Sequence, residues 1–317
     1  MSNGESHSLL LVHGRGFKPS QEAWLDLSLQ SMRAGIVRDY PDCVSAFDVL
    51  DKYHAYYGDL TNTLLQECGG QYDEQIDIGD RQNVLAELRK IDVRKRFGIR
   101  QYDRLPGKSA LPEFVVDIGA PLLGAFGLTM PILKAMAKDF AAYLQNELEY
   151  AEQVRCRVRD RIIELFEKGD RILLISHGTG SAIVYDVLWQ LSHQREYKSR
   201  FEGNKVDTWV TLGSPLGDRN IRKYLYGAKE KLAARFPNNV ISWQNVSAED
   251  DFTCHDNTLA DDFKKMMDHH VVSAVHDYQV FNLAVRYGKS NPHSSIGYYI
   301  HPRVAKIISD WIGVEPT

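Results

Sequence analysis

The sequence predicts an α/β protein with an open, mostly parallel sheet flanked by helices. Three observations indicate this class. Short apolar runs end at turn residues, as expected of strands buried on both faces of a parallel sheet. Amphipathic stretches with helical spacing lie between these runs, and such alternation is typical of parallel α/β sheets. The length of 317 residues fits one such domain, because folds of this class often exceed about 200 residues.

Four apolar runs are expected to form strands, since each is short and bounded by turn residues: Ser8–Val12, Arg171–Ser176, Val206–Leu212 and Val240–Val246. Helices are expected over Lys134–Lys168, as two helices, and over Gly180–His193, where apolar residues follow one face. A last helix is expected after Pro302, which suits a first helical position.

The middle of the chain departs from this alternation. Residues 68–107 are polar with little strand signal, and Ile118–Leu133 then runs for 16 residues without a charge. A membrane-spanning helix needs about 20 apolar residues, and two prolines interrupt this run, so no transmembrane segment is expected. We expect a single domain over 1–317 in which 68–133 is an insertion that acts as a cap, a lid or a partner-facing surface.

Charge and cysteine content exclude several classes of protein. The 38 Lys and Arg residues are outnumbered by 42 Asp and Glu residues, for a net charge of −4, so nucleic acid is not an expected partner. The four cysteines form no C-x-x-C pair and are too sparse for a disulfide framework. The N-terminus lacks the pattern of a signal peptide. We expect a cytoplasmic protein with reduced thiols, and the sequence leaves its oligomeric state open.

No cofactor and no metal ion are expected. The segment Gly14–Lys18 lacks the spacing of a phosphate-binding P-loop. The pairs His255–Asp256 and His269–His270 do not have the ligand spacing of protein zinc sites. Any chemistry is therefore expected to come from the side chains and backbone of the chain itself.

The strongest candidate for chemistry is the turn Ser176–Gly180, which reads Ser-His-Gly-Thr-Gly. It lies between an expected buried strand and an expected amphipathic helix, the setting of a nucleophile elbow. Such a turn exposes its central residue in a strained conformation, and small residues on either side let neighbouring backbone approach. The central residue is Gly178, which tolerates the strain but offers no nucleophile.

These motifs resemble the α/β-hydrolase superfamily, in particular its intracellular lipase- and esterase-like members. Ser176–Trp189 is similar to their strand end, elbow and helix, and His13–Gly16 is similar to the HG-x-G loop that supplies an oxyanion N–H. Thr211–Gly217 is similar to the segment that closes the next strand. The resemblance covers about residues 8–35 and 140–313, and it implies an α/β-hydrolase fold.

The resemblance also implies a catalytic triad in the chain order nucleophile, acid, histidine. Gly178 stands at the nucleophile position. The acid should follow the strand Val240–Val246, where Asp250 is the first choice and Asp251 the alternative. His293, in a loop before the last helix, matches the histidine. The acid would hold the imidazole in the correct tautomer, and the histidine would act as general base.

Two backbone N–H groups are implied as the oxyanion hole. One would come from Arg15 or Gly16, and the other from Thr179, at a helix start where N–H groups are free. No other serine is well placed as a nucleophile, because the four nearby candidates lie in the strand, in the helix or in adjoining loops: Ser176, Ser181, Ser214 and Ser294.

The sequence thus predicts a serine-hydrolase scaffold for a small-molecule carboxylic ester, with a lipid ester as one option. The apolar stretch Ile118–Leu133 would contact the acyl group. The chain is expected to be inactive or severely impaired without serine at 178, and Gly178 is either an introduced substitution or the native residue. The alternative is a non-catalytic protein of the same fold that binds a ligand or partner in the pocket. The sequence does not indicate which residues bind the substrate.

Overall fold

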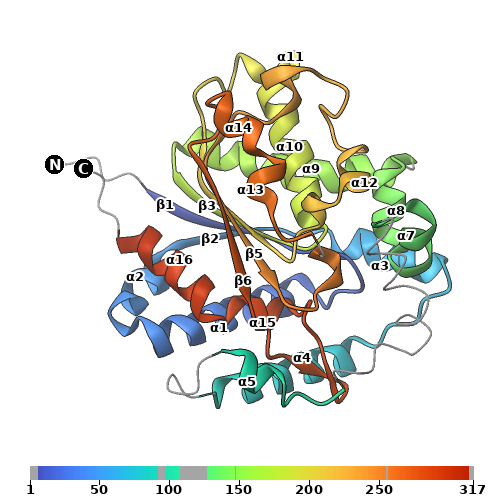
Figure 1. The fold of residues 1–317 in the computed structure, drawn as a ribbon, viewed down its shortest axis with the longest axis vertical. Coiled ribbons are helices and arrows are strands. Elements are labelled where there is room, and N and C mark those ends of the chain that lie inside the picture. Colours follow the sequence, from blue (N-terminus) through green and yellow to red (C-terminus); the bar gives the residue numbers. More distant parts are fainter. Residues whose placement is uncertain (1–5, 92–96, 108–126, 147, 255, 314–317) are drawn as a thin grey trace.

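One sheet of six parallel strands organises the structure, in the order β2-β1-β3-β4-β5-β6 (Figure 1). The computed structural model describes residues 6–91, 97–107, 127–146, 148–254 and 256–313. The strands are β1 (His7–Val12), β2 (Asp51–Ala55), β3 (Arg171–His177), β4 (Val206–Leu212), β5 (Val240–Ala248) and β6 (Ala274–Val280). The predicted α/β class is confirmed, and all four expected strands form.

The two strands without a continuous apolar run lie at the two edges of the sheet. β2 pairs with β1, and β6 pairs with β5. Both contain exposed or half-buried polar residues along much of their length. Strands at an edge are covered less completely than interior strands, so their sequences need not be apolar throughout. This is why the pattern of buried runs does not reveal them.

Helices cover both faces of the sheet (Figure 1). One layer holds α1 (Gln21–Asp39), α2 (Val44–Val49), α15 (Ser295–Tyr299) and α16 (Pro302–Gly313). The other holds α8 (Lys138–Leu144), α9 (Leu148–Lys168), α10 (Gly180–His193) and α14 (Lys264–Asp268). The predicted helices over Gly180–His193 and after Pro302 are thus confirmed as α10 and α16.

Further helices and turns complete the described part of the chain. The helices are α3 (Gly58–Glu67), α4 (Glu74–Arg89), α5 (Ile99–Tyr102), α7 (Met130–Met136), α11 (Arg195–Lys198), α12 (Arg219–Arg222) and α13 (Leu259–Asp262). The 3-10 turns are η1 (Pro41–Cys43), η3 (Pro215–Gly217), η4 (Leu232–Arg235) and η5 (Phe252–Cys254). A small antiparallel hairpin pairs β7 (Val285–Arg286) with β8 (Lys289–Ser290).

Alternate residues of the central strands supply the two cores. On β1, Leu10 and Val12 join the core beneath α9 and α10, whereas Leu9 and Leu11 join the core beneath α1 and α16. All four side chains are fully buried. This is the expected outcome for side chains of period two on a sheet that is covered on both faces.

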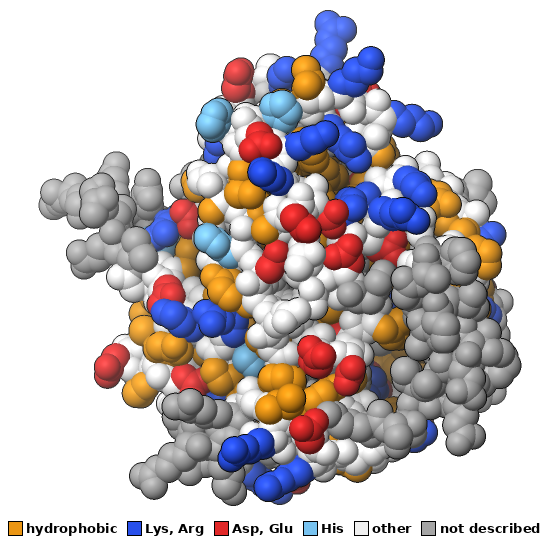
Figure 2. All heavy atoms as spheres, viewed as in Figure 1, with side chains coloured by type: hydrophobic (Ala, Val, Ile, Leu, Met, Phe, Trp, Pro, Cys, Tyr) orange, Lys and Arg blue, Asp and Glu red, His pale blue; other side chains and the backbone are white. Residues whose placement is uncertain are grey.

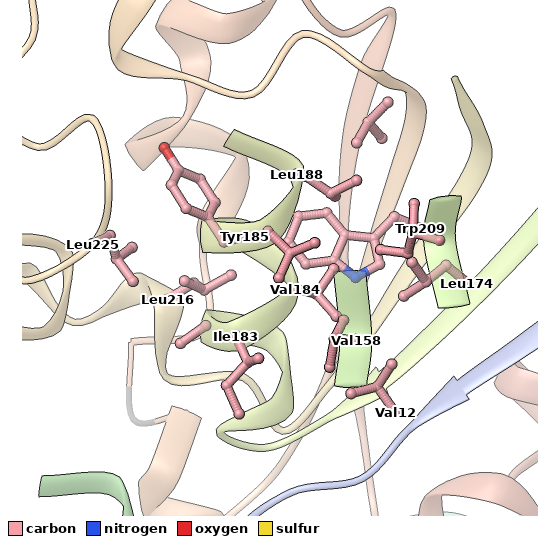
Figure 3. Packing of buried hydrophobic residues seen from close by; sticks show 14 of the residues in the cluster. Val12, Val158, Leu174, Ile183, Val184, Tyr185, Leu188, Trp209, Leu216 and Leu225 are labelled. Carbon is pink, nitrogen blue, oxygen red and sulfur yellow. The ribbon is translucent and has the colours of Figure 1, made fainter. Parts of the chain in front are cut away.

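The first core fixes α10 on the sheet. Trp209 of β4 lies close to Leu188 and Val184 of α10 (Figure 3). Its ring stacks on that of Trp243 of β5, with centroids 4.4 Å apart, and its indole N–H donates to the Ser176 hydroxyl at 2.9 Å. The turn between β3 and α10 is therefore attached at both ends to well-packed elements.

Lys134–Lys168 belongs to three helices, α7, α8 and α9, and the prediction of two was wrong. The chain leaves helical geometry between α8 and α9 at Asn146, whose φ of 52° is left-handed. Asparagine tolerates this conformation better than most residues, and it is a common way to end a helix. The break between α7 and α8 falls at Ala137, a good helix former, so the sequence gives no sign of it.

The expected insertion 68–133 is described in part. Its described elements are α4, α5 and the residues from 127 onward, whereas 108–126, including most of the run Ile118–Leu133, lie outside the described residues. α4 packs against α1 and α15. Its apolar side chains form a third core with the end of α5, the segment between β6 and β7, and α15: Val84, Leu85, Leu88, Tyr102, Leu283, Ala284, Ile296 and Ile300.

The surface exposes charges of both signs. Figure 2 shows Lys and Arg side chains over the upper part of one face and Asp and Glu side chains mainly in its middle.

Among the helices of the described residues, none combines the length and apolar character needed to cross a bilayer.

Candidate active site

The predicted site residues lie on loops at the carboxyl ends of the strands. The strands are parallel, so the loops after β1, β3, β4 and β5 meet at this end of the sheet. The loop between β8 and α15 brings His293 to the same end. The structure thus brings together segments that are far apart in sequence.

The turn after β3 has the backbone expected of an elbow. β3 ends at His177, Gly178 has a φ of 53°, and α10 begins at Gly180. Only glycine adopts this left-handed conformation without strain. A Cβ on Gly180 would collide with the carbonyl oxygen of His13, so the missing side chain lets the loop after β1 approach the turn.

Asp251, rather than Asp250, is the carboxylate against His293. Its two oxygens lie 3.0 and 2.9 Å from His293 Nδ1. Asp250 is exposed with a left-handed φ of 59°, and its carboxylate accepts a hydrogen bond from the Tyr102 hydroxyl at 2.8 Å. The first choice of acid is therefore corrected to its alternative, because the sharp turn after β5 directs the two neighbouring side chains differently.

Burial and hydrogen-bond partners act in opposite directions on Asp251, which is 3% exposed. Burial favours the neutral acid, but His293, the Tyr298 hydroxyl at 2.7 Å and the Thr253 N–H at 3.1 Å favour the charged form. The partners outweigh burial, and the pKa of Asp251 lies below its ordinary value. A carboxylate in this position keeps the imidazole proton on Nδ1.

Gly213, at the end of β4, makes the contact between acid and histidine possible. It has a φ of 57°, and a Cβ there would lie 2.6 Å from Asp251 Oδ2 and 3.1 Å from His293 Nδ1. Any side chain at this position would therefore push the pair apart.

The loop that carries His293 is held from two sides. The Asn282 side-chain amide donates to the carbonyls of Pro292 and Ser294, both at 2.9 Å. His177 donates from Nε2 to the His293 carbonyl at 3.1 Å. Burial, and next the charge of His293, hold the pKa of His177 well below its ordinary value, so His177 acts as a neutral donor. The sequence analysis assigned no role to Asn282.

The second ring nitrogen of His293 lies next to the elbow. A Cβ built on Gly178 would lie 2.9 Å from Nε2 and 3.1 Å from Cε1. Nε2 is buried and has no hydrogen-bond partner in the described part of the chain. With the proton held on Nδ1, Nε2 carries a lone pair and can act as a general base toward residue 178.

One of the expected oxyanion donors is already occupied. The Gly16 N–H donates to Asp139 Oδ2 at 2.7 Å. The backbone N–H groups of Arg15 and Thr179 donate to no other residue among those described. Of the three predicted donors, Arg15 and Thr179 therefore remain, and Gly16 serves to attach the β1 loop to α8.

A buried lysine, for which the sequence analysis gave no role, shapes this loop. Lys18 Nζ donates to the carbonyl oxygens of Arg15 at 2.5 Å and Gly16 at 3.0 Å. Burial, and next the charge of Arg81, lower the pKa of Lys18 to about 7. Because the carbonyl and N–H of one peptide point in opposite directions, the bond to the Arg15 carbonyl turns the Gly16 N–H away from Lys18, toward Asp139.

An apolar pocket adjoins the remaining donors. Its cavity volume is about 20 Å³, and Arg15 and Thr179 belong to its lining. Most other lining side chains come from α7, α8 and η5, among them Met136, Phe140 and Phe252. Leu128, Ile132 and Leu133, at the end of the apolar run expected to contact an acyl group, also line it.

The four other serines are engaged in local structure. Ser176 and Ser181 are fully buried, and their hydroxyls lie 3.0 Å apart. The hydroxyls of Ser214 and Ser294 accept hydrogen bonds from nearby backbone N–H groups. Within the described residues, none of these hydroxyls donates to His293.

No three His, Cys, Asp or Glu side chains gather as a metal site would require in the ranges that the structure describes. Comparisons with protein-family models, with curated proteins and with solved structures found no match for this chain. Its function has therefore to be inferred from the geometry of the site.

Proposed function

We propose that this chain is an α/β-hydrolase-like protein whose site is built to hydrolyse carboxylic esters with an apolar acyl group. In this site Gly178 stands at the position of the nucleophile. Asp251 orients His293, His293 is the general base, and the Arg15 and Thr179 N–H groups bind the developing oxyanion.

The observation that carries the proposal is the pair of Asp251 and His293 beside the elbow turn. The buried carboxylate contacts Nδ1, and Nε2 lies against residue 178. This is the relation between acid, base and nucleophile position that acyl transfer by a triad requires. A carboxylate and an imidazole paired only for stability would have no need of a glycine elbow beside Nε2.

The pocket supports an apolar acyl group as the part of the substrate that it holds. Its lining is almost entirely apolar, and it includes the two residues that supply the proposed oxyanion donors, Arg15 and Thr179. An ester carbonyl at Arg15 and Thr179 would therefore place its acyl chain against α7 and α8. Burying such a chain contributes roughly 0.8 kcal/mol for each methylene group.

The substitution Gly178→Ser tests the proposal. We expect the variant to form a covalent adduct at residue 178 with an alkyl fluorophosphonate and to hydrolyse p-nitrophenyl butyrate and octanoate through an acyl-enzyme. Because a Cβ there lies 2.9 Å from Nε2, the His293 ring has to retreat by a few tenths of an ångström. The left-handed backbone costs about 1–2 kcal/mol with serine, which urea unfolding would measure.

Gly288→Ser is the matched control. Gly288 has a φ of 73°, so serine there meets similar backbone strain, but no atom lies within 4 Å of its Cβ. We expect neither labelling nor ester hydrolysis from the hydroxyl of this control. A folded Gly178→Ser protein that is neither labelled nor active would contradict the proposed function.

The apolar pocket also favours a second function, the binding of an apolar ligand without catalysis. Its lining is almost entirely apolar, as is typical of small-ligand sites. In that case a fluorescent fatty acid binds to the chain and to Gly178→Ser with equal affinity, while neither protein turns over esters.

A further inference from the structure

We infer that the chain is itself a hydrolase without serine, in which His293 activates a water molecule for direct attack on the ester carbonyl. This inference rests on the proposed function and assigns the nucleophile that the elbow lacks. It also assigns a role to Gly178, namely to keep a side chain away from Nε2.

The first support is the position of the imidazole. The place of a Cβ on Gly178 has only two atoms of His293 near it, at 2.9 and 3.1 Å, and the next atom, Gly14 Cα, is 3.9 Å away. A Cβ closer than about 3.0 Å to a ring atom requires the ring to move. With glycine at this position, no side chain lies between Nε2 and a water molecule that enters with the substrate.

The second support is the state of the two ring nitrogens. Nδ1 contacts both oxygens of Asp251. Asp251 is buried, and its hydrogen-bond partners favour its charged form. Nε2 is buried without a partner among the described residues. An unpaired buried nitrogen costs free energy, and its lone pair is suited to accept a proton from water that enters with the substrate.

The third support is the isolation of Nε2 from competing hydroxyl groups. Ser176 and Ser181 contact each other, and the Ser294 hydroxyl accepts from a backbone N–H of its own helix. The Tyr298 hydroxyl donates to Asp251. None of these hydroxyls is in a position to replace serine at the elbow, so water is the nucleophile that the geometry leaves.

The reaction then proceeds in two balanced steps. One O–H bond of water breaks, its proton passes to Nε2, and its oxygen forms a bond to the carbonyl carbon, while the carbonyl electron pair moves to the oxygen at the Arg15 and Thr179 N–H groups. The carbon–oxygen bond to the alcohol then breaks, and the leaving alkoxide takes the proton from Nε2. The products are a carboxylic acid and an alcohol, and His293 is neutral again.

The experiment compares the unaltered chain with Gly178→Ala, His293→Ala and Gly178→Ser on p-nitrophenyl butyrate and octanoate. We expect the unaltered chain to turn over without a burst and without inactivation by an alkyl fluorophosphonate. His293→Ala should lower kcat/KM by about 100-fold or more, the usual contribution of a general base. Gly178→Ala should do the same, because its methyl group would lie against Nε2 and block the approach of water. Gly288→Ala controls for left-handed strain, and circular dichroism confirms folding of each variant.

Each outcome decides the inference. It is overturned if the unaltered chain is inactive, if its activity survives Gly178→Ala or His293→Ala, or if the fluorophosphonate blocks it. When the unaltered chain is inactive and Gly178→Ser is labelled and active, only the water mechanism fails and the proposed function stands. When Gly178→Ser is also unlabelled and inactive, the proposed function fails with it.

Discussion

Two buried carboxylates, Asp251 at the end of β5 and Asp186 in the middle of α10, have opposite pKa shifts. Both are nearly inaccessible, at 3% and 4% exposure. The pKa of Asp251 lies below its ordinary value, whereas burial raises the pKa of Asp186 to about 6. Asp186 accepts hydrogen bonds from the Tyr143 hydroxyl at 2.7 Å and the Tyr226 N–H at 2.8 Å, so it is as well paired with neutral donors as Asp251.

The difference lies in the imidazole. Asp251 touches a group that can carry a positive charge, and Asp186 does not: Arg155 acts on it only through a weaker charge effect. Hydrogen bonds to neutral donors therefore do not suffice to overcome burial here, while a contacting imidazole does. The two carboxylates thus differ in whether a contacting partner can carry a positive charge.

The largest expected effect comes from Asp251→Asn on the Gly178→Ser background. The amide cannot hold the proton on Nδ1 as a carboxylate does, so kcat should fall roughly 10⁴-fold, the magnitude for loss of a triad acid. Steady-state kinetics on p-nitrophenyl butyrate measures it. Asp250→Asn is the matched control and should change kcat less than threefold, since Asp250 is exposed and bonded to Tyr102. Equal losses in both variants would remove the distinction between the two aspartates.

Gly213→Ala disturbs the same pair without replacing either partner. The added methyl lies 2.6 Å from Asp251 Oδ2 at a left-handed position, so backbone strain and overpacking together should cost about 2–5 kcal/mol. Gly288→Ala has the strain alone and should cost about 1–2 kcal/mol. Urea unfolding measures the loss in free energy of unfolding for each variant, and the difference between the two losses is the steric contribution at Gly213. Identical losses would mean that Gly213 does not set the spacing of the pair.

The pH dependence of stability sharpens the comparison through Asp186→Asn. With a folded pKa of about 6 against 3.8 unfolded, the native state binds more protons between these values, so Asp186 makes the protein less stable as pH rises through that window. The penalty at pH 7 is about 3 kcal/mol. Asn cannot ionise, and about 0.5 kcal/mol of the penalty is already present at pH 4, so the cost of the substitution should be about 2 kcal/mol smaller at pH 7 than at pH 4, measured by urea unfolding at both.

Asp251 should show the opposite sign in the same experiment. Its folded pKa is lowered, so its contribution to stability is present above the unfolded pKa and is lost as pH falls. Asp251→Asn should therefore cost more at pH 7 than at pH 4. A common sign for both variants would show that the two carboxylates are not in contrasting environments.

Tyr298→Phe gives the smallest expected effect. Its hydroxyl donates to Asp251 and accepts from the Ala248 N–H at 2.8 Å, so its removal leaves two buried groups underpaired at a cost of about 1–3 kcal/mol. Tyr102→Phe, whose hydroxyl bonds the exposed Asp250, should cost about 0.5 kcal/mol. Thermal unfolding distinguishes the two, and a larger loss in Tyr102→Phe would contradict the assignment.

The sequence predicts the interior of the fold better than its edges. Interior strands and the helix Gly180–His193 follow from continuous apolar runs and from helical periodicity, which burial imposes directly. β2 and β6 were not predicted, because an edge strand is only partly covered and its sequence need not be a continuous apolar run. The break at Ala137 was not predicted, because alanine favours helix and the local sequence therefore does not mark the end of α7.

Within the site, motif order locates Gly178, His293 and a pair of adjacent acids, but it cannot choose between the acids. That choice depends on the φ of 59° at Asp250, which turns the chain so that Asp251 contacts the imidazole. Tyr298, Asn282 and Lys18 support the site through hydrogen bonds between distant segments. Such bonds leave no local pattern in the sequence.

The third apolar core, which joins α4 to α15, couples the stability of the His293 loop to that of a distant part of the chain. Ile296 and Ile300 lie in this core with Val84 and Leu88, a few residues beyond His293. Segments that share a core tend to open together as one cooperative unit. We therefore expect the amide hydrogens of α15 and α4 to exchange at similar rates, and we expect separation of α4 from this core to loosen the loop that carries His293.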